Sequence, residues 1–81
     1  MRFPGEEPQK GVFVVLSRPA GRDGREFVRD PVSDPEIDVA LDDLEHEDQL
    51  VGKLTGMGWR LTFVGGGSRS DETRRFYFRR I

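Results

Sequence analysis

The 81-residue chain contains no cysteine and a single histidine, His46. Without cysteine there is no disulfide framework, no thiolate nucleophile and no Cys-based zinc site. These absences exclude a small extracellular scaffold held together by disulfides, and we expect a cytoplasmic protein.

Long hydrophobic runs are also missing. No apolar stretch approaches the roughly 18 residues that a membrane-spanning helix needs, so we expect no membrane partner. The first ten residues carry prolines and acidic side chains where a signal peptide has an apolar centre. We interpret residues 1–10 as a flexible N-terminal tail. Residues 11–81 suffice for one modest core, which predicts a single domain.

A catalytic constellation is absent from the sequence pattern. His46 stands among Glu45, Glu47 and Asp48 on a predicted helix surface, where solvation explains it. The spacing of the remaining residues brings no nucleophile, base and orienting group together. The Gly-rich stretch 65–70 lacks the lysine and the following helix of a phosphate-binding loop. We therefore predict that the protein is not an enzyme and has no cofactor and no small-molecule substrate.

A calcium-loop spacing occurs in the acidic part of the chain, but it is incomplete. Five acidic residues match the ligand positions of such a loop: Asp34, Glu36, Asp38, Asp42 and Glu45. Val39 stands where the sharp turn of the loop needs glycine, and Pro35 follows the first ligand. Because a stretch this acidic gives such matches by chance, we predict no metal site.

Charge is abundant and unevenly distributed along the chain. Residues 30–50 carry nine acidic side chains and no basic one, whereas residues 51–81 carry seven basic and two acidic side chains. This division predicts either an acidic and a basic surface with separate partners or two segments that neutralise each other in the fold.

The first half of the chain predicts two strands. Gly11 to Ser17 is β-branched and aromatic, with apolar residues on both faces, which is typical of a central strand. A turn at residues 20–24 leads into a second short strand from Arg25 to Arg29, which pairs back as a hairpin.

The middle of the chain predicts one main helix. Asp34 followed by Pro35 has the form of a helix start, although residues 36–41 fit a helix or a strand equally well. From Asp42, a second cap-like residue, the helical pattern is clearer and ends at Gly56 and Gly58. Three residues on one face are expected to pack on the sheet: Leu44, Val51 and Leu54.

The last third predicts a hairpin. Residues 59–64 alternate, which places Trp59, Leu61 and Phe63 on one face and Arg60, Thr62 and Val64 on the other. A flexible loop at residues 65–70 joins this strand to a final strand over residues 73–81. Together the elements predict a two-layer α+β domain, with three or four antiparallel strands and one main helix on one face of the sheet, and Trp59 at the helix-to-strand junction.

The stretch from Leu50 to Val64, LVGKLTGMGWRLTFV, resembles part of a group of small bacterial proteins of unknown function. In that group a helix ends in a Leu-Gly-x-x-Gly-Trp-x-Leu type core and leads into a hairpin whose last strand finishes in Phe-x-Arg. The matching positions here are Leu54, Gly58, Trp59, Leu61, Phe76, Phe78 and Arg79. The chain departs from the pattern at Thr55, where the family has its first Gly, and in its acidic insert at residues 30–43. The resemblance implies a bacterial protein with an α+β layer and no known active site.

The C-terminal sequence TRRFYFRRI predicts a strand with two different faces. Phe76 and Phe78 would pack under the helix. Five residues would form the opposite surface, which we call the open sheet face: Arg60, Thr62, Arg75, Tyr77 and Arg79. Arginines around an aromatic ring are typical of surfaces that bind single-stranded nucleic acid. The same pattern also fits an ordinary edge strand that its charges keep soluble.

The open sheet face is also expected to carry apolar residues that no second helix covers, namely Phe13, Val15, Val64 and Tyr77. Such a patch on a small two-layer domain is often buried against a partner or another copy. The leading hypothesis is therefore a non-catalytic interaction module that binds a protein partner or itself through this face. The alternative is single-stranded nucleic-acid binding.

The acidic segment 34–48 supports a third, weaker hypothesis. Four of its residues could dock on a basic partner, as an inhibitor would: Asp38, Asp42, Asp43 and Glu47.

Overall fold

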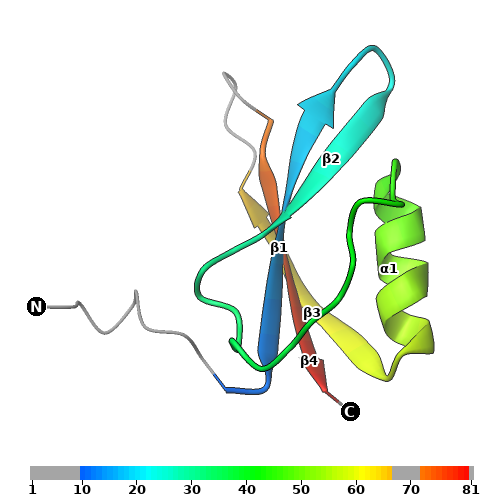
Figure 1. The fold of residues 1–81 in the computed structure, drawn as a ribbon. Helices are drawn as coiled ribbons and strands as arrows, with labels where there is room; N and C mark the ends of the chain where they lie inside the picture. The colour runs from blue at the N-terminus through cyan, green and yellow to red at the C-terminus, as the bar shows by residue number, and fades with distance from the viewer. Residues whose placement is uncertain (1–9, 67–71, 81) are drawn as a thin grey trace, which may run out of the picture.

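The computed structural model describes residues 10–66 and 72–80 and shows a four-stranded antiparallel sheet with one helix on one face (Figure 1). The elements are, in order, β1 (Val12–Ala20), β2 (Gly24–Arg29), α1 (Glu47–Gly56), β3 (Trp59–Gly66) and β4 (Arg74–Arg80). This confirms the predicted α+β architecture. Residues 1–9 of the predicted tail, residues 67–71 around the predicted loop, and Ile81 lie outside the described residues. No helix in the described part is long and apolar enough to cross a membrane.

The strand order is β2-β1-β4-β3, so two hairpins are joined through β1 and β4. β1 is an interior strand, as its apolar pattern predicts. Val12 pairs with Arg79, and Ser17 pairs with Arg74 at the other end of the β1–β4 ladder. β4 is therefore also an interior strand, and its interpretation as an edge strand is wrong. Its arginines flank two buried phenylalanines, Phe76 and Phe78, and each of these pairs with residues of β1 on one side and β3 on the other.

Helix α1 begins later than the sequence pattern predicts. Its N-cap is His46, whose backbone N–H donates to Gln49 Oε1 at 3.1 Å. Neither Asp34 nor Asp42 starts a helix, so both predicted caps are wrong. The end of the helix agrees better with the prediction, because Gly58 adopts a φ of 90°, a conformation that glycine allows at a helix end.

Residues 30–46 form an irregular segment between β2 and α1. The ambiguity over residues 36–41 is resolved in favour of neither helix nor strand. Ile37 and Leu44 of this segment nevertheless bury their side chains in the core. Pro31 and Pro35 oppose a regular helix or strand here because neither carries a backbone N–H. Burial of the two apolar side chains stabilises the irregular segment instead.

The irregular segment is fastened to β1 beyond the point where β2 ends. The Ser33 hydroxyl accepts the Val14 backbone N–H at 2.8 Å and donates to the Val14 carbonyl at 3.0 Å. One residue later, the Asp34 N–H donates to the Val12 carbonyl at 2.8 Å. A side chain and a backbone group thus take the place of a strand partner and satisfy the buried polar groups of β1.

The core lies between α1 and the sheet. The helix contributes Leu50 and Leu54, both fully buried, while Val51 is only partly buried at the margin. Leu54 was predicted, Leu50 was not, and Leu44 reaches the core from the irregular segment instead of from the helix. Six aromatic and aliphatic residues of the sheet complete the layer: Phe13, Val15, Phe27, Trp59, Phe76 and Phe78. Trp59 lies at the α1–β3 junction, as expected.

Phe13 and Val15 face the helix, so their predicted place on the open sheet face is wrong. Side chains alternate along β1, and the opposite face therefore receives Val12, Val14 and Leu16. Val12 and Val14 are themselves buried. The β1 part of the open sheet face thus presents little accessible apolar surface.

A β-bulge in β3 overturns the predicted alternation of that strand. Leu61 pairs with Phe78, but Phe63 pairs with Tyr77 and Val64 with Phe76, because the register shifts by one residue between Leu61 and Phe63. The bulge turns Phe63 to the open sheet face and Val64 to the helix side, the reverse of the prediction.

Candidate functional site

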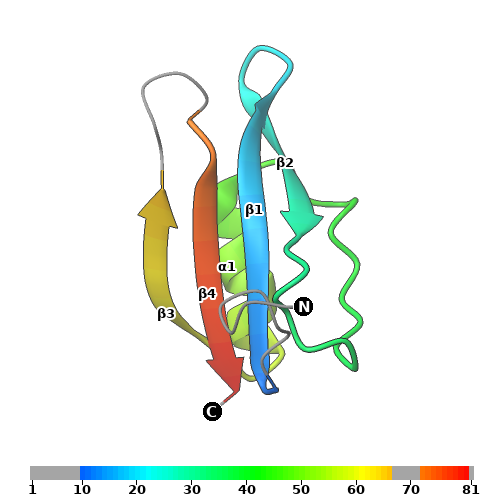
Figure 2. The same cartoon turned by 90° about the vertical axis from the view of Figure 1, so that its left-hand side faces the viewer.

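The open sheet face is the surface opposite α1, and Figure 2 shows the helix behind the sheet when this face is toward the viewer. Three of the predicted residues, Arg75, Tyr77 and Arg79, lie on it side by side along β4. Arg60 lies on β3 across from Arg79. These four residues therefore lie on the part of the face that β3 and β4 build.

Two aromatic rings form the centre of this surface. Phe63 and Tyr77 are cross-strand partners whose ring centroids are 5.7 Å apart with an interplanar angle of 59°. Phe63 is 60% exposed, the most exposed of the large hydrophobic residues in the described part of the chain, whereas Tyr77 is half-buried. The surface therefore offers one ring that is free to stack and a second that supports it.

Thr62 lies between the two halves of β3, at the bulge. Its hydroxyl donates to the Tyr77 backbone carbonyl at 3.1 Å. Although the residue is exposed, this bond fixes its side chain against β4. We assign Thr62 to the support of the bulge and of the Phe63–Tyr77 pair, where the sequence had placed it among the contact residues.

The arginines of the open sheet face differ in whether they form ion pairs. Arg60 and Arg79 are exposed cross-strand partners, and within residues 10–66 and 72–80 neither has an ion pair. Arg75 Nε lies 3.7 Å from Oδ2 of the buried Asp30, while most of its side chain stays exposed. Like charges placed directly opposite each other destabilise a sheet. The Arg60–Arg79 pair therefore favours an anion that would bridge the two guanidinium groups.

The four predicted acidic docking residues do not form one surface. Asp38, Asp42 and Asp43 are exposed on the irregular segment. The Lys53 ammonium donates to Asp43 at 3.1 Å, and this hydrogen bond lowers the pKa of the Asp43 carboxyl. Glu47 is turned toward the sheet and only 23% of its side chain is exposed.

Glu47 belongs to a polar network that ties α1 to the sheet. Its carboxylate accepts the Ser17 hydroxyl at 2.9 Å and lies 3.2 Å from Arg25 Nε and 3.3 Å from Arg74 Nη1. Arg25 also donates to the Ser17 hydroxyl at 2.6 Å. Three strands and the helix meet at this carboxylate, which gives it a structural role, and its predicted docking role stays a prediction. Part of the acidic and basic charge of the chain is therefore neutralised internally.

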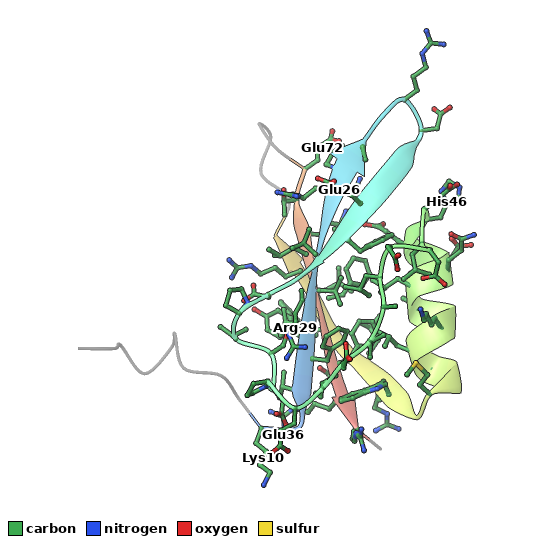
Figure 3. The ribbon with its side chains drawn as sticks, in the orientation of Figure 1. Lys10, Glu26, Arg29, Glu36, His46 and Glu72 are labelled. Carbon is green, nitrogen blue, oxygen red and sulfur yellow. The ribbon has the colours of Figure 1, made fainter. Side chains whose placement is uncertain are left out.

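A hollow of about 300 Å³ lies at the end of the sheet where Lys10 and Glu36 are labelled in Figure 3. Its lining comprises Lys10, Gly11, Asp34, Glu36, Ile37 and Arg80. The Asp34 carboxylate is already hydrogen-bonded within the protein. It accepts the backbone N–H groups of Gly11 and Glu36, and these bonds lower its pKa. Arg80 lies over the Trp59 ring, 5.0 Å from its centroid. Opposite charges therefore share this wall, and the hollow offers no field of one sign to a ligand.

Within the described ranges, no group of three or more His, Asp or Glu residues is placed to hold a metal ion. Comparison of the chain with protein-family models, with curated proteins and with solved structures found no match. The chemistry of the open sheet face is therefore inferred from its own geometry.

Phe63 is the residue of this candidate site that sequence reasoning missed. The alternation of residues 59–64 placed it in the core, and only the bulge brings it to the surface. One signal was present in the sequence, since Gly65 follows two residues later and glycine inside a strand often marks a bulge or a close approach.

Proposed function

We propose that the chain is a small non-catalytic module that binds single-stranded nucleic acid on the open sheet face. Phe63 and Tyr77 would stack on bases, and Arg60, Arg75 and Arg79 would contact the phosphates. The observation that carries this proposal is that Arg60 and Arg79 lie opposite each other near the exposed Phe63 ring, and that neither has an ion pair within residues 10–66 and 72–80. The expected cytoplasmic location, and the bacterial origin that the resemblance implies, agree with such a ligand.

The arginines would supply the electrostatic part of the binding energy. Two guanidinium groups on neighbouring strands repel each other in the free protein, and a bound phosphate would convert that repulsion into two charge-assisted hydrogen bonds. Binding also releases counterions from the nucleic acid, so the affinity should fall steeply with salt. The overall charge of −2 does not oppose this, because the acidic side chains lie mainly in residues 30–50 and not on β3 or β4.

The aromatic pair favours a single strand over a duplex. A base stacks on a protein ring only after it leaves its neighbours in the helix, which costs little in a single strand. Each such stacking contact contributes about 1–3 kcal/mol. Phe63 supplies the ring for the first contact because most of its surface is exposed.

The test is a titration of fluorescently labelled oligo-dT and oligo-U of about 12 nucleotides, followed by anisotropy at low salt, with a duplex of the same length as the comparison. We expect single strands to bind more tightly than the duplex, and Phe63→Ala to weaken binding by about 5- to 150-fold. Val28→Ala is the matched control, since Val28 is also exposed but lies on β2 at the other edge of the sheet. Absence of binding to both single strands at low salt would refute the proposal.

A protein ligand is the second candidate for the same face. The exposed Phe63 ring could fill a partner pocket as an aromatic anchor flanked by arginines. This candidate ranks lower than it did from sequence, because Phe13 and Val15 face the core and the exposed large apolar residues on this face are Phe63 and, across the sheet on β2, Val28. Capture from a lysate that survives nuclease treatment and is lost in Phe63→Ala would favour it.

A further inference from the structure

The two edges of the sheet differ in how they are covered. The edge of β2 is engaged by the irregular segment: the Arg25 N–H donates to the Glu45 carbonyl at 2.9 Å, and the Arg29 guanidinium donates to the carbonyl oxygens of Asp34 and Ile37. β3 pairs with β4 on one side only. Within the described residues, no backbone or side-chain group bonds to its outer edge, which Figure 2 shows at the margin of the sheet.

Exposed apolar side chains gather at this open edge. Of the four large hydrophobic residues exposed in the described part, three lie on β3 or in the turn that precedes it: Met57 at 53%, Phe63 at 60% and Val64 at 43%. Phe63 lies on the open sheet face, and Val64, which pairs with Phe76, lies on the helix side. An unpaired strand with apolar side chains on both faces is a template for pairing with another strand.

The usual protections of an edge strand are weak here. β3 contains neither lysine nor proline, and its one charged residue, Arg60, lies near the start of the strand. The bulge at Thr62 is the remaining protection, and it precedes the exposed pair Phe63 and Val64. The second half of β3 is therefore available for a ladder.

We propose that β3 pairs with β3 of a second copy of this chain, antiparallel, about a two-fold axis near Val64. A second copy fits because an antiparallel pairing of identical strands is self-complementary. Val64 of each copy then meets its counterpart, and each Phe63 faces the glycine-rich end of the other strand. The two Arg60 side chains lie at opposite ends, roughly 26 Å apart for eight residues of strand, so like charges do not meet.

This dimer has a consequence for the open sheet face. An axis perpendicular to the sheet leaves both open sheet faces on the same side, as one continuous surface. The inference itself rests on the edge of β3 and not on the proposed nucleic-acid binding, so either can fail alone.

The first experiment measures mass by sedimentation velocity from about 1 to 500 μM, since an interface of one strand from each copy falls below the standard size of about 800 Å² per partner and should dissociate on dilution. We expect a reversible dimer. Val64→Lys should shift the chain to the monomer without loss of the circular dichroism spectrum, because Val64 is exposed and lysine opposes edge pairing. The matched variant Val28→Lys, on the covered edge, should remain a dimer.

A second experiment uses the absence of cysteine in the chain. Oxidation of Val64→Cys should give a disulfide-linked dimer at low micromolar concentration, because the axis places residue 64 opposite itself. Val28→Cys should cross-link at least tenfold more slowly. A monomeric wild type at all concentrations, or equal cross-linking of the two variants, would overturn the proposal. If the chain is a monomer and another protein protects the β3 edge, β3 pairs with a strand of that protein and not with a second copy.

Discussion

The ring of Phe63 occupies the space that a side chain at Gly65 would need. A Cβ built on Gly65 would come within 2.5 Å of Phe63 Cε1. Gly65 pairs with Arg75 and faces the same side as Phe63, so the Phe63 ring lies along the strand over Gly65. The position of the exposed ring therefore depends on the absence of a side chain two residues later.

Gly65→Ala should displace the Phe63 ring and leave the fold intact. The backbone at Gly65 is not in the left-handed region, and the ring can swing outward because it is exposed. We expect thermal stability to change by no more than about 1 kcal/mol, while affinity for oligo-dT falls at least about fivefold. Gly52→Ala is the control: no atom lies within 4 Å of the new Cβ, and alanine in α1 should raise stability without touching binding. Equal affinity of both variants would contradict the role assigned to the ring.

Arg79→Ala should alter binding and stability in opposite directions. Loss of one phosphate contact reduces the slope of log affinity against log salt by about 0.7 for a single strand. Removal of the repulsion between Arg79 and Arg60 should raise the melting temperature at low salt, and this gain should disappear at high salt. Arg22→Ala, in the β1–β2 turn, removes the same charge elsewhere and should leave the slope unchanged. An unchanged slope for Arg79→Ala would count against a phosphate contact.

Glu47→Ala should destabilise the fold by about 1.5–3 kcal/mol in urea unfolding. The change removes the shared acceptor of Ser17 and Arg25 and leaves the largely buried Arg25 guanidinium without its carboxylate. Glu26→Ala provides the comparison, because the Arg18–Glu26 pair is half exposed on both sides and should contribute no more than about 1 kcal/mol. Similar losses of stability in the two variants would show that the Glu47 network stabilises the fold no more than an exposed ion pair does.

Asp34 should contribute a pH dependence of stability at the acid end. The Gly11 and Glu36 backbone N–H groups lower its pKa in the folded chain. A carboxyl with a lower folded pKa stabilises the fold above its unfolded pKa of about 3.9, and this stabilisation is lost as the pH falls through the folded value. Urea melts between about pH 5 and pH 2 should therefore show a steeper decline for the wild type than for Asp34→Asn. Parallel curves would show that Asp34 does not contribute to the loss of stability in acid.

Much of the fold could be predicted from local pattern. Val12 to Leu16 mark an interior strand, and Trp59 marks the end of the helix. Residues 74–80 mark a strand, but their arginines did not reveal that it lies inside the sheet. The helix start could not be read in the same way. Asp34 has the chemistry of an N-cap, but its carboxylate bonds to Gly11, 23 residues earlier, and that tertiary contact prevails over the local preference.

The candidate site was predictable only in part. Arg75, Tyr77 and Arg79 follow from the alternation of a regular strand. Phe63 does not, because a bulge shifts the period by one residue and the sequence does not state where an extra residue falls. Glu47 was placed on the surface for a similar reason: a helix pattern does not reveal that Arg25 and Arg74 converge on it from two strands.

The position of β4 has a consequence for the synthesis of the protein. β4 leaves the ribosome after the other four elements, yet it lies between β1 and β3, and its ladder joins Val12 to Arg79. Until β4 emerges, the nascent chain can form the β1–β2 hairpin but has no partner for the other side of β1, and Phe13 and Val15 lack the cover of Phe76 and Phe78. The sheet can therefore close only after residues 74–80 have been synthesised, and a ribosome that stalls before residue 74 would release a chain in which β1 and β3 lack their common partner.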